Sequence, residues 1–399
     1  MKALQYVKSV PRYLASRYVG SRVERLYTSG FSTVRLVDIP PPGLPGARWA
    51  RVRPILSGIC GSDLATITAQ GTTYFSPFVS TPFVFGHEVV GEVVETGSDV
   101  SRIRVGERVA LSPPLHCAVR GIAELCPECR AGETGHCRNV TGGVVSAGIQ
   151  TGYCRDTGGG WSGSLVAHEL QLHAVPDGIS DEAAVLIEPF SCCLHAVERA
   201  DVPREGTVLV IGCGTIGALT IAALRASGSR CRLIAVARYP HQAATARRLG
   251  ADVVIGGGRS MRSDLARELG VELHETELGP PTSLAGADVT FDCIASGRTL
   301  DDAMRFTRAR GAVIVVGMPG IPDGVDWTAM WHKELDVRGS YTSDEPTFER
   351  AVSIAAGLDA SLAPLVGARF PLAEWPAALR SALHSGESGV MKTAFVPAP

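Results

Sequence analysis

The stretch Val208–Gly217, VLVIGCGTIG, decides the fold of the C-terminal half of the chain. Its apolar run is typical of a buried strand, and the residues that follow, GTIGALTIAALRAS (214–227), have the apolar spacing of a helix. Gly212 permits a tight turn, Gly214 lets a pyrophosphate approach the backbone, and Gly217 lets the helix pack closely on the strand. In this strand–turn–helix context the glycines favour a dinucleotide site over an ordinary glycine turn. The phosphates would meet the free N–H groups at the helix start, around Thr215 and Ile216.

Strands and helices alternate on the C-terminal side of this stretch. RLIAVA (232–237) and ADVVIG (251–256) are expected strands with HQAATARRLG (241–250) as a helix between them. GADVTFDCI (286–294), TLDDAMRFTR (299–308) and GAVIVVGM (311–318) continue the pattern as strand, helix and strand. This alternation predicts a parallel, doubly wound α/β sheet. Residues 256–285 carry no clear pattern and stay unassigned.

The first 110 residues differ, because short β-type runs such as WARVRPILSGI (49–59) and GERVAL (106–111) alternate with Gly and Pro. They predict an all-β, barrel-like region. Residues 9–30 are basic, contain a possible helical turn and are expected to form a surface excursion. Near the other end, TFERAVSIAAG (347–357) is expected to be helical and MKTAFV (391–396) a closing strand.

The composition limits the function. The 399 residues carry a formal net charge of -2, which gives no general attraction to nucleic acid or to an anionic membrane. The N-terminus lacks the apolar core of a signal peptide, and no run of about 20 apolar residues predicts a membrane span. Eleven cysteines without a secretion signal favour metal ligation or buried thiols in a reducing cytoplasm.

The end of the second strand indicates which dinucleotide binds. An NAD site usually has Asp or Glu there, which accepts hydrogen bonds from the ribose hydroxyls. Here Ala237 takes that position and Arg238 follows. A small neutral residue beside an arginine suits a 2′-phosphate, so NADP is expected in preference to NAD.

Three further segments contain potential metal ligands: GICGSDL (58–64), GHE (86–88) and LIEPFSCCLHA (186–196). Together with GERVAL, VLVIGCGTIG and SGESGVMKTAF (385–395), they occur in an order that resembles the zinc-dependent medium-chain dehydrogenases, the alcohol, sorbitol and threonine dehydrogenase superfamily. The resemblance covers nearly the whole chain but does not identify the substrate. It implies a GroES-like β-barrel catalytic domain (1–189 and 339–399) and a Rossmann cofactor domain (190–338).

The resemblance also implies the catalytic zinc ligands. Cys60 and His87 are the first two, and Glu188 is the third, directly or through water. Glu88 can alternate as a carboxylate ligand, and Asp63 is expected to orient the imidazole of His87. Lys392, in the last of the shared motifs, is expected to contact the cofactor.

A second cysteine cluster matches the structural zinc lobe of that superfamily, here expected at about 112–140. Cys126, Cys129 and Cys137 have the family's spacing, but Ala123 stands where the first cysteine is usual. An enlarged loop could bring Cys117 to a closed four-cysteine site. A fourth ligand from His116 or His136, or no metal at all, stays open as an alternative.

The reaction that the resemblance implies is reversible hydride transfer between an alcohol and the nicotinamide, assisted by zinc. Ser62 is the usual first hydroxyl of the proton relay, but Ala65 stands where many relatives have a histidine. Thr66, Glu88 or water could replace that histidine. The expected partners are a secondary alcohol or polyol, or the matching carbonyl compound, and further copies of the chain in a homodimer or homotetramer. A zinc-free NADPH enone or quinone reductase and a non-catalytic dinucleotide-binding protein are the alternatives.

Overall fold

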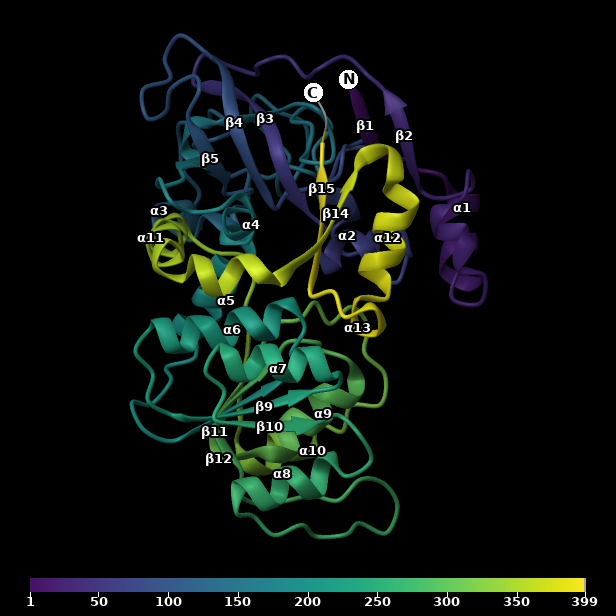
Figure 1. Cartoon of the computed structure of the whole chain (residues 1–399), viewed down its shortest axis with the longest axis vertical. Coiled ribbons are helices and arrows are strands. Elements are labelled where there is room, and N and C mark those ends of the chain that lie inside the picture. Colours follow the sequence, from purple (N-terminus) through teal and green to yellow (C-terminus); the bar gives the residue numbers. More distant parts are fainter. Residues whose placement is uncertain (398–399) are drawn as a thin grey trace. The chain divides into compact units, whose positions relative to one another are not determined.

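A computed structural model describes residues 1–397 and separates the chain into two compact units, each described here by itself. Unit 1 comprises Met1–Glu188 and the C-terminal segment from Ser343, and unit 2 comprises Pro189–Thr342 (Figure 1). Strand β13 (Asp336–Gly339) pairs with β12 in the sheet of unit 2, so that unit runs past residue 338. The assignment of the two units as catalytic and cofactor domains stays a prediction. Within the described residues, no helix combines the length and apolarity needed to cross a bilayer.

Unit 2 contains a parallel six-stranded sheet in the order β10-β9-β8-β11-β12-β13, which confirms the predicted doubly wound fold. Its other strands are β8 (Thr207–Ile211), β9 (Arg232–Ala237), β10 (Val253–Gly256), β11 (Ala287–Asp292) and β12 (Thr307–Val315). Its helices are α6 (Thr215–Ala226), α7 (Pro240–Arg248), α8 (Met261–Leu269), α9 (Gly297–Phe306) and α10 (Thr328–Lys333). Figure 1 shows α6 and α7 on one side of the sheet and α8 on the other.

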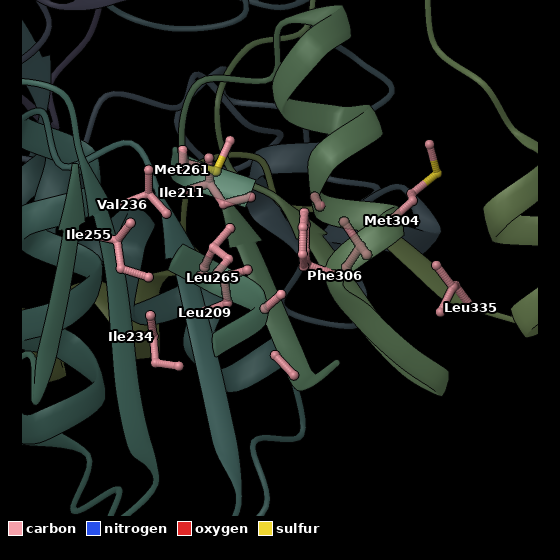
Figure 2. Packing of buried hydrophobic residues seen from close by; sticks show 14 residues of the cluster. Leu209, Ile211, Ile234, Val236, Ile255, Met261, Leu265, Met304, Phe306 and Leu335 are labelled. Carbon is pink, nitrogen blue, oxygen red and sulfur yellow. The ribbon is translucent and has the colours of Figure 1, made fainter. Parts of the chain in front are cut away.

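Helix α8 lies in the segment that the sequence left unassigned. Met261 and Leu265, four residues apart on one face of the helix, are buried against strand residues such as Leu209 and Ile234 (Figure 2). Gly270 ends the helix in the left-handed conformation, with φ 66°. The spacing of Met261 and Leu265 and the terminal glycine were therefore the sequence signals of this helix.

Unit 1 contains a seven-stranded sheet around β3 (Trp49–Gly58), the strand expected at WARVRPILSGI. The path β14-β15-β3-β4-β5-β7 comprises β14 (Val366–Pro371), β15 (Lys392–Val396), β4 (Val89–Thr96), β5 (Arg108–Leu111) and β7 (Leu172–Ala174), while β6 (Leu165–His168) pairs with β3. Strands β1 (Lys2–Tyr6) and β2 (Val34–Asp38) form a separate pair. The helices include α2 (Gly61–Ile67), α3 (Pro127–Arg130), α4 (Asp181–Ala184), α11 (Glu345–Leu362), α12 (Trp375–Leu383) and α13 (Ser385–Ser388). Helix α5 (Ile187–Arg199) begins at the end of unit 1 and continues in unit 2.

The basic segment near the N-terminus forms helix α1 (Val10–Tyr18) and a 3-10 helix, η1 (Glu24–Thr28). The guanidinium of Arg12 donates to the backbone oxygens of Gly30 and Ser32 at 2.9 and 2.6 Å. Arg17 donates to the backbone oxygen of Ala69 at 2.8 Å. These bonds attach α1 to the rest of unit 1, and α1 is longer than the single turn that the sequence suggested.

Candidate functional site

Three strand ends of unit 1 meet at one place. Strand β3 ends at Gly58, and the backbone N–H of Gly58 donates to the backbone oxygen of Glu88, just before β4 begins, at 2.9 Å. Strand β15 begins at Lys392 and is antiparallel to β3. The sheet thus brings together four of the predicted site residues from distant parts of the sequence: Cys60, His87, Glu88 and Lys392.

Asp63 connects Cys60 to His87. Cys60 is the N-cap of α2, and its backbone N–H donates to Asp63 Oδ2 at 3.0 Å. The other carboxylate oxygen, Asp63 Oδ1, lies 3.5 Å from His87 Nδ1. Asp63 is fully buried, so these partners replace the water that its carboxylate gives up.

The role of His87 as a metal ligand stays a prediction, and the ring nitrogen that it would use follows from its surroundings. Burial alone lowers the pKa of His87, but the Asp63 carboxylate and the Cys60 sulfur outweigh burial and raise that pKa well above its usual value. Because Nδ1 faces Asp63, Nε2 is the ring nitrogen left for a metal ligand bond. The thiol of Cys60 and the imidazole of His87 are of the donor types that suit zinc, and a carboxylate would complete the set. Among the described residues, the ligand atoms that lie within 4.8 Å of one another are those of the four-cysteine cluster described below, so a metal at Cys60 and His87 stays a prediction.

Glu88 and Lys392 form a buried ion pair beside these groups. The ammonium of Lys392 donates to Glu88 Oε1 at 2.5 Å. A Cβ at Gly58 would overlap Glu88 Oε2 and lie 2.8 Å from Lys392 Cε, so a glycine at 58 makes room for the pair. Burial lowers the pKa of Lys392, but Glu88 foremost, then Cys60 and Glu188, raise it above its usual value. Contact between Lys392 and the cofactor stays a prediction.

Glu188 is the second residue of α5 and is 7% exposed. Its carboxylate contributes, after Glu88 and Cys60, to the raised pKa of Lys392. Its role as a metal ligand, directly or through water, stays a prediction.

Hydroxyl groups also gather near Asp63. Ser62 and Thr66 both lie on α2, and the Thr66 hydroxyl donates to the backbone oxygen of Ser62 at 2.9 Å. The hydroxyl of Tyr153 lies 3.3 Å from Thr66 Oγ1 and donates to Asp63 Oδ1, also at 3.3 Å. No pattern in the sequence points to Tyr153, because it stands in an irregular loop 90 residues from Asp63.

The glycine-rich loop of unit 2 has the geometry that its motif predicts. Gly212 follows β8 with φ 89°, and a Cβ at Gly217 would overlap the backbone oxygen of Gly212. At Gly214, the N-cap of α6, no atom of the described residues lies within 4 Å of where a Cβ would be, so a ligand can approach. Thr215 and Ile216 form the first turn of α6, where helix N–H groups point outward.

The loop lies where the strand order of the sheet reverses, at the pairing of β8 with β11, which is where such sheets bind nucleotides. Ala237 ends β9 and is buried, whereas Arg238 is exposed. The guanidinium of Arg238 lies 5.4 Å from the centre of the Tyr239 ring.

The four cysteines of the second cluster lie together in unit 1. Their sulfur atoms are all within 4.8 Å of one another, and those of Cys117 and Cys137 are 3.6 Å apart. Tetrahedral zinc with four thiolates requires sulfur–sulfur distances of about 3.8 Å, so the cluster fits the ion. The enlarged loop therefore brings Cys117 to the other three sulfurs, and a ligand from His116 or His136 is not needed to complete a set of four.

Amide groups support the sulfur of Cys117. The backbone N–H of Cys126 and the side-chain amide of Asn139 donate to Cys117 Sγ at 3.4 and 3.2 Å. Burial raises the pKa of Cys117, but these donors outweigh it and lower that pKa to about 7. A thiol that ionises near neutral pH is ready to bind a metal.

Comparison with known proteins identifies the family of the chain. Residues 46–177 match the alcohol dehydrogenase GroES-like domain, and residues 215–357 match the zinc-binding dehydrogenase family. An L-idonate 5-dehydrogenase of Vitis vinifera is 31% identical over 312 residues, 78% of each chain. A D-arabitol-phosphate dehydrogenase of Enterococcus avium is 25% identical over 91% of this chain and 94% of its own.

Among solved structures, a zinc-binding dehydrogenase of Sinorhizobium meliloti bound to NADP has a TM-score of 0.71 and 26% identity over 91% of this chain and 95% of its own. A 2R,3R-butanediol dehydrogenase of Bacillus subtilis has a TM-score of 0.73 at 21% identity over 100% and 99%, and supports the fold alone. The paired domain matches and the relative from Vitis vinifera settle the family. The chain belongs to the zinc-dependent medium-chain dehydrogenase superfamily and is an oxidoreductase of the alcohol dehydrogenase type.

Proposed function

We propose that the protein transfers hydride reversibly between a secondary alcohol or polyol, or the matching carbonyl compound, and a nicotinamide cofactor, with NADP preferred to NAD. The observation that carries the proposal is the convergence of Cys60, His87 and Glu88 at the strand ends of unit 1. Zinc, when bound there, would supply the Lewis acidity that polarises the alcohol or carbonyl oxygen. The four-cysteine cluster would hold a second, structural zinc, because four thiolates leave no position open for substrate.

The chain's own residues would hold the ligands and move the proton. Asp63 Oδ1 faces Nδ1 of His87 at 3.5 Å, which would leave Nε2 for the metal. Lys392 balances the charge of Glu88 and keeps that carboxylate beside the site. Ser62 is the candidate for the first proton transfer from the alcohol, and Thr66, on the same helix, is the candidate to continue the path in place of a histidine at position 65.

The relatives support a secondary alcohol as the substrate. The names of the relatives from Vitis vinifera and Enterococcus avium identify L-idonate and D-arabitol phosphate, both compounds with several secondary hydroxyl groups. A third relative, from Legionella pneumophila, is an L-threonine 3-dehydrogenase that is 29% identical over 88% of this chain. The hydroxyl of threonine is secondary as well.

Metal analysis combined with an activity screen tests the proposal. Purified protein is expected to contain zinc and to oxidise NADPH with members of a panel of ketones and sugars, and His87→Ala is expected to lose that turnover. Turnover that survives in His87→Ala and after metal removal would instead indicate the zinc-free reductase. Cofactor binding without turnover on any member of the panel would indicate the non-catalytic alternative.

The preference for NADP rests on Ala237 and Arg238. An exposed guanidinium next to a small neutral residue suits a 2′-phosphate, and the solved relative from Sinorhizobium meliloti has NADP bound. In Arg238→Ala, the ratio of NADPH affinity to NADH affinity is expected to fall by about 10- to 100-fold, as loss of a charged hydrogen bond of about 1.5–3 kcal/mol implies. Fluorescence titration measures both affinities.

Arg230→Ala provides the matched control, because Arg230 is also exposed but precedes the opposite end of β9. Its affinity ratio should equal that of the unmodified protein. An unchanged ratio in Arg238→Ala would remove the assignment of NADP.

A further inference from the structure

Tyr153 lies in the loop before β6, outside every motif described above. Its ring is 8% exposed and packs in the aromatic core of unit 1, with ring centres 5.0 Å from Phe83 and 6.4 Å from Phe85. The ring centre of His87 is 5.9 Å away. An aromatic ring fixed in this way holds its hydroxyl at a defined position.

Two glycines bring this loop to His87. Gly86 has φ 98° and Gly152 has φ 87°, both in the left-handed region. A Cβ at Gly152 would lie 3.0 Å from the backbone oxygen of Gly86 and 3.1 Å from its carbonyl carbon. The backbone before Tyr153 therefore packs directly on the backbone before His87, and the two side chains start from adjacent positions.

The hydroxyl of Tyr153 donates to Asp63 Oδ1 at 3.3 Å, and the same oxygen lies 3.5 Å from His87 Nδ1. Asp63 Oδ2 accepts from the backbone N–H of Cys60. The Asp63 carboxylate is thus held from two directions, by the helix that carries Cys60 and by Tyr153. The same carboxylate faces the imidazole of His87 across the 3.5 Å from Oδ1 to Nδ1.

We propose that Tyr153 is a positioning residue of the metal site, which fixes Asp63 so that Nε2 of His87 faces the metal. The inference rests on the proposed function, because it requires a metal at Cys60 and His87. Loss of a partner of this kind typically weakens metal binding by about 10- to 100-fold. Since Tyr153 acts through Asp63 rather than on His87 itself, the expected loss for Tyr153→Phe is about tenfold, at the lower end of that range.

Cobalt binding tests the proposal without an activity assay. Protein that keeps zinc in its four-cysteine cluster is loaded with Co²⁺ at the other site, and the visible bands that are absent in His87→Ala report that site. Tyr153→Phe is expected to bind Co²⁺ about tenfold more weakly in competition with a chelator and to shift those bands. A residue with only a packing role would change the protein's stability and leave the bands where they are.

Tyr27→Phe is the matched control. Tyr27 is 5% exposed in the same hydrophobic cluster, but its hydroxyl donates to the backbone oxygen of Ser16 at 3.4 Å. Tyr27→Phe should therefore cost stability without changing cobalt affinity or spectrum. Equal affinity and equal bands in Tyr153→Phe and Tyr27→Phe would overturn the proposal.

A double-mutant cycle shows whether Tyr153 acts through Asp63. In an Asp63→Ala background, Tyr153→Phe should have no further effect on cobalt affinity, and a persisting tenfold loss would contradict the proposal. If the proposed function itself were wrong, the result would differ from a failure of the Tyr153 inference. The protein without substitutions would then show no cobalt bands that depend on His87.

Discussion

At the scale of single residues, the Glu88–Lys392 pair is the most consequential charge arrangement of unit 1. Both side chains are at most 5% exposed, so water does not screen either charge. Removing one partner of a buried pair leaves the other charge uncompensated and typically destabilises a protein by about 3–5 kcal/mol. We therefore expect Lys392→Met to lower the free energy of unfolding by about that amount. Urea denaturation, followed by a spectroscopic signal from unit 1, measures this change.

Removing both charges together should lower the free energy of unfolding far less than removing one. The double variant Glu88→Gln, Lys392→Met should recover at least half of the loss, because no unpaired charge remains. The exposed pair of Lys2 and Asp38 gives the comparison, with side chains 62% and 69% exposed. Lys2→Met should cost at most about 1 kcal/mol. A double variant as unstable as Lys392→Met alone would contradict the role assigned to the pair.

At the scale of elements, the four-cysteine lobe should depend on its metal. Unmodified protein is expected to contain two zinc ions per chain, and Cys117→Ser only one, because the cluster loses a ligand. The segment from 112 to 140, which has little regular structure beyond α3 and η3 (Thr134–His136), should then become sensitive to limited proteolysis.

Cys154→Ser is the control for the lobe, since Cys154 is fully buried but stands outside the cluster. It should keep both zinc ions, as measured by elemental analysis. Two zinc ions per chain in Cys117→Ser would show that Cys117 is not a ligand.

Two buried histidines in neighbouring elements should make unit 1 sensitive to acid. Burial first, then Arg48, lowers the pKa of His168 to about 4, and its Nδ1 accepts from the backbone N–H of Leu170, which requires the neutral ring. Burial also lowers the pKa of His173, on β7, to about 4. The unfolded chain binds these protons near pH 6.5 and the folded chain only near pH 4, so stability is lost as pH falls between those values.

Each histidine should contribute about 2–3 kcal/mol to that loss. Urea denaturation at pH 7 and pH 4.5 measures the difference in unfolding free energy. His173→Gln should reduce this difference by about half, whereas His384→Gln, at a half-exposed surface position, should leave it unchanged. Equal pH dependence in His173→Gln and the unmodified protein would contradict this account.

The elements that the sequence predicted correctly each carry a local period or a fixed motif, whereas helix α8 was missed although its spacing was also present. RLIAVA is β9 at its full length, and VLVIGCGTIG is the turn between β8 and α6. Contacts between distant segments leave no such trace. Lys392 and Glu88 are 304 residues apart, and nothing in either motif shows that one is the counter-ion of the other. Tyr153 in its irregular loop was missed for the same reason.

At the scale of the whole molecule, the sheet of unit 2 has an edge strand that could pair with a strand of another copy of the chain. Strand β13 is the last in the order, and an edge strand presents unpaired backbone groups to its surroundings. Apolar side chains that follow β12 are also exposed: Met318 is 43%, Ile321 73%, Trp327 50% and Trp331 77% exposed. These residues all lie in the segment between β12 and the edge strand β13, and exposed aromatic and aliphatic residues are typical of a contact between subunits.

We therefore expect that the homodimer or homotetramer implied by the resemblance forms through this surface. Light scattering coupled to gel filtration should give the mass of a dimer or tetramer, and Trp331→Asp should reduce it, because a charge in an apolar contact loses its hydration without gaining a partner. Leu278→Asp is the matched control, since Leu278 is 96% exposed but lies in the connection between α8 and β11. The Leu278→Asp variant should form an assembly of the same mass as the protein without substitutions. An unmodified protein with the mass of a single chain, or a Trp331→Asp variant that assembles normally, would mean that another surface or no surface joins the subunits.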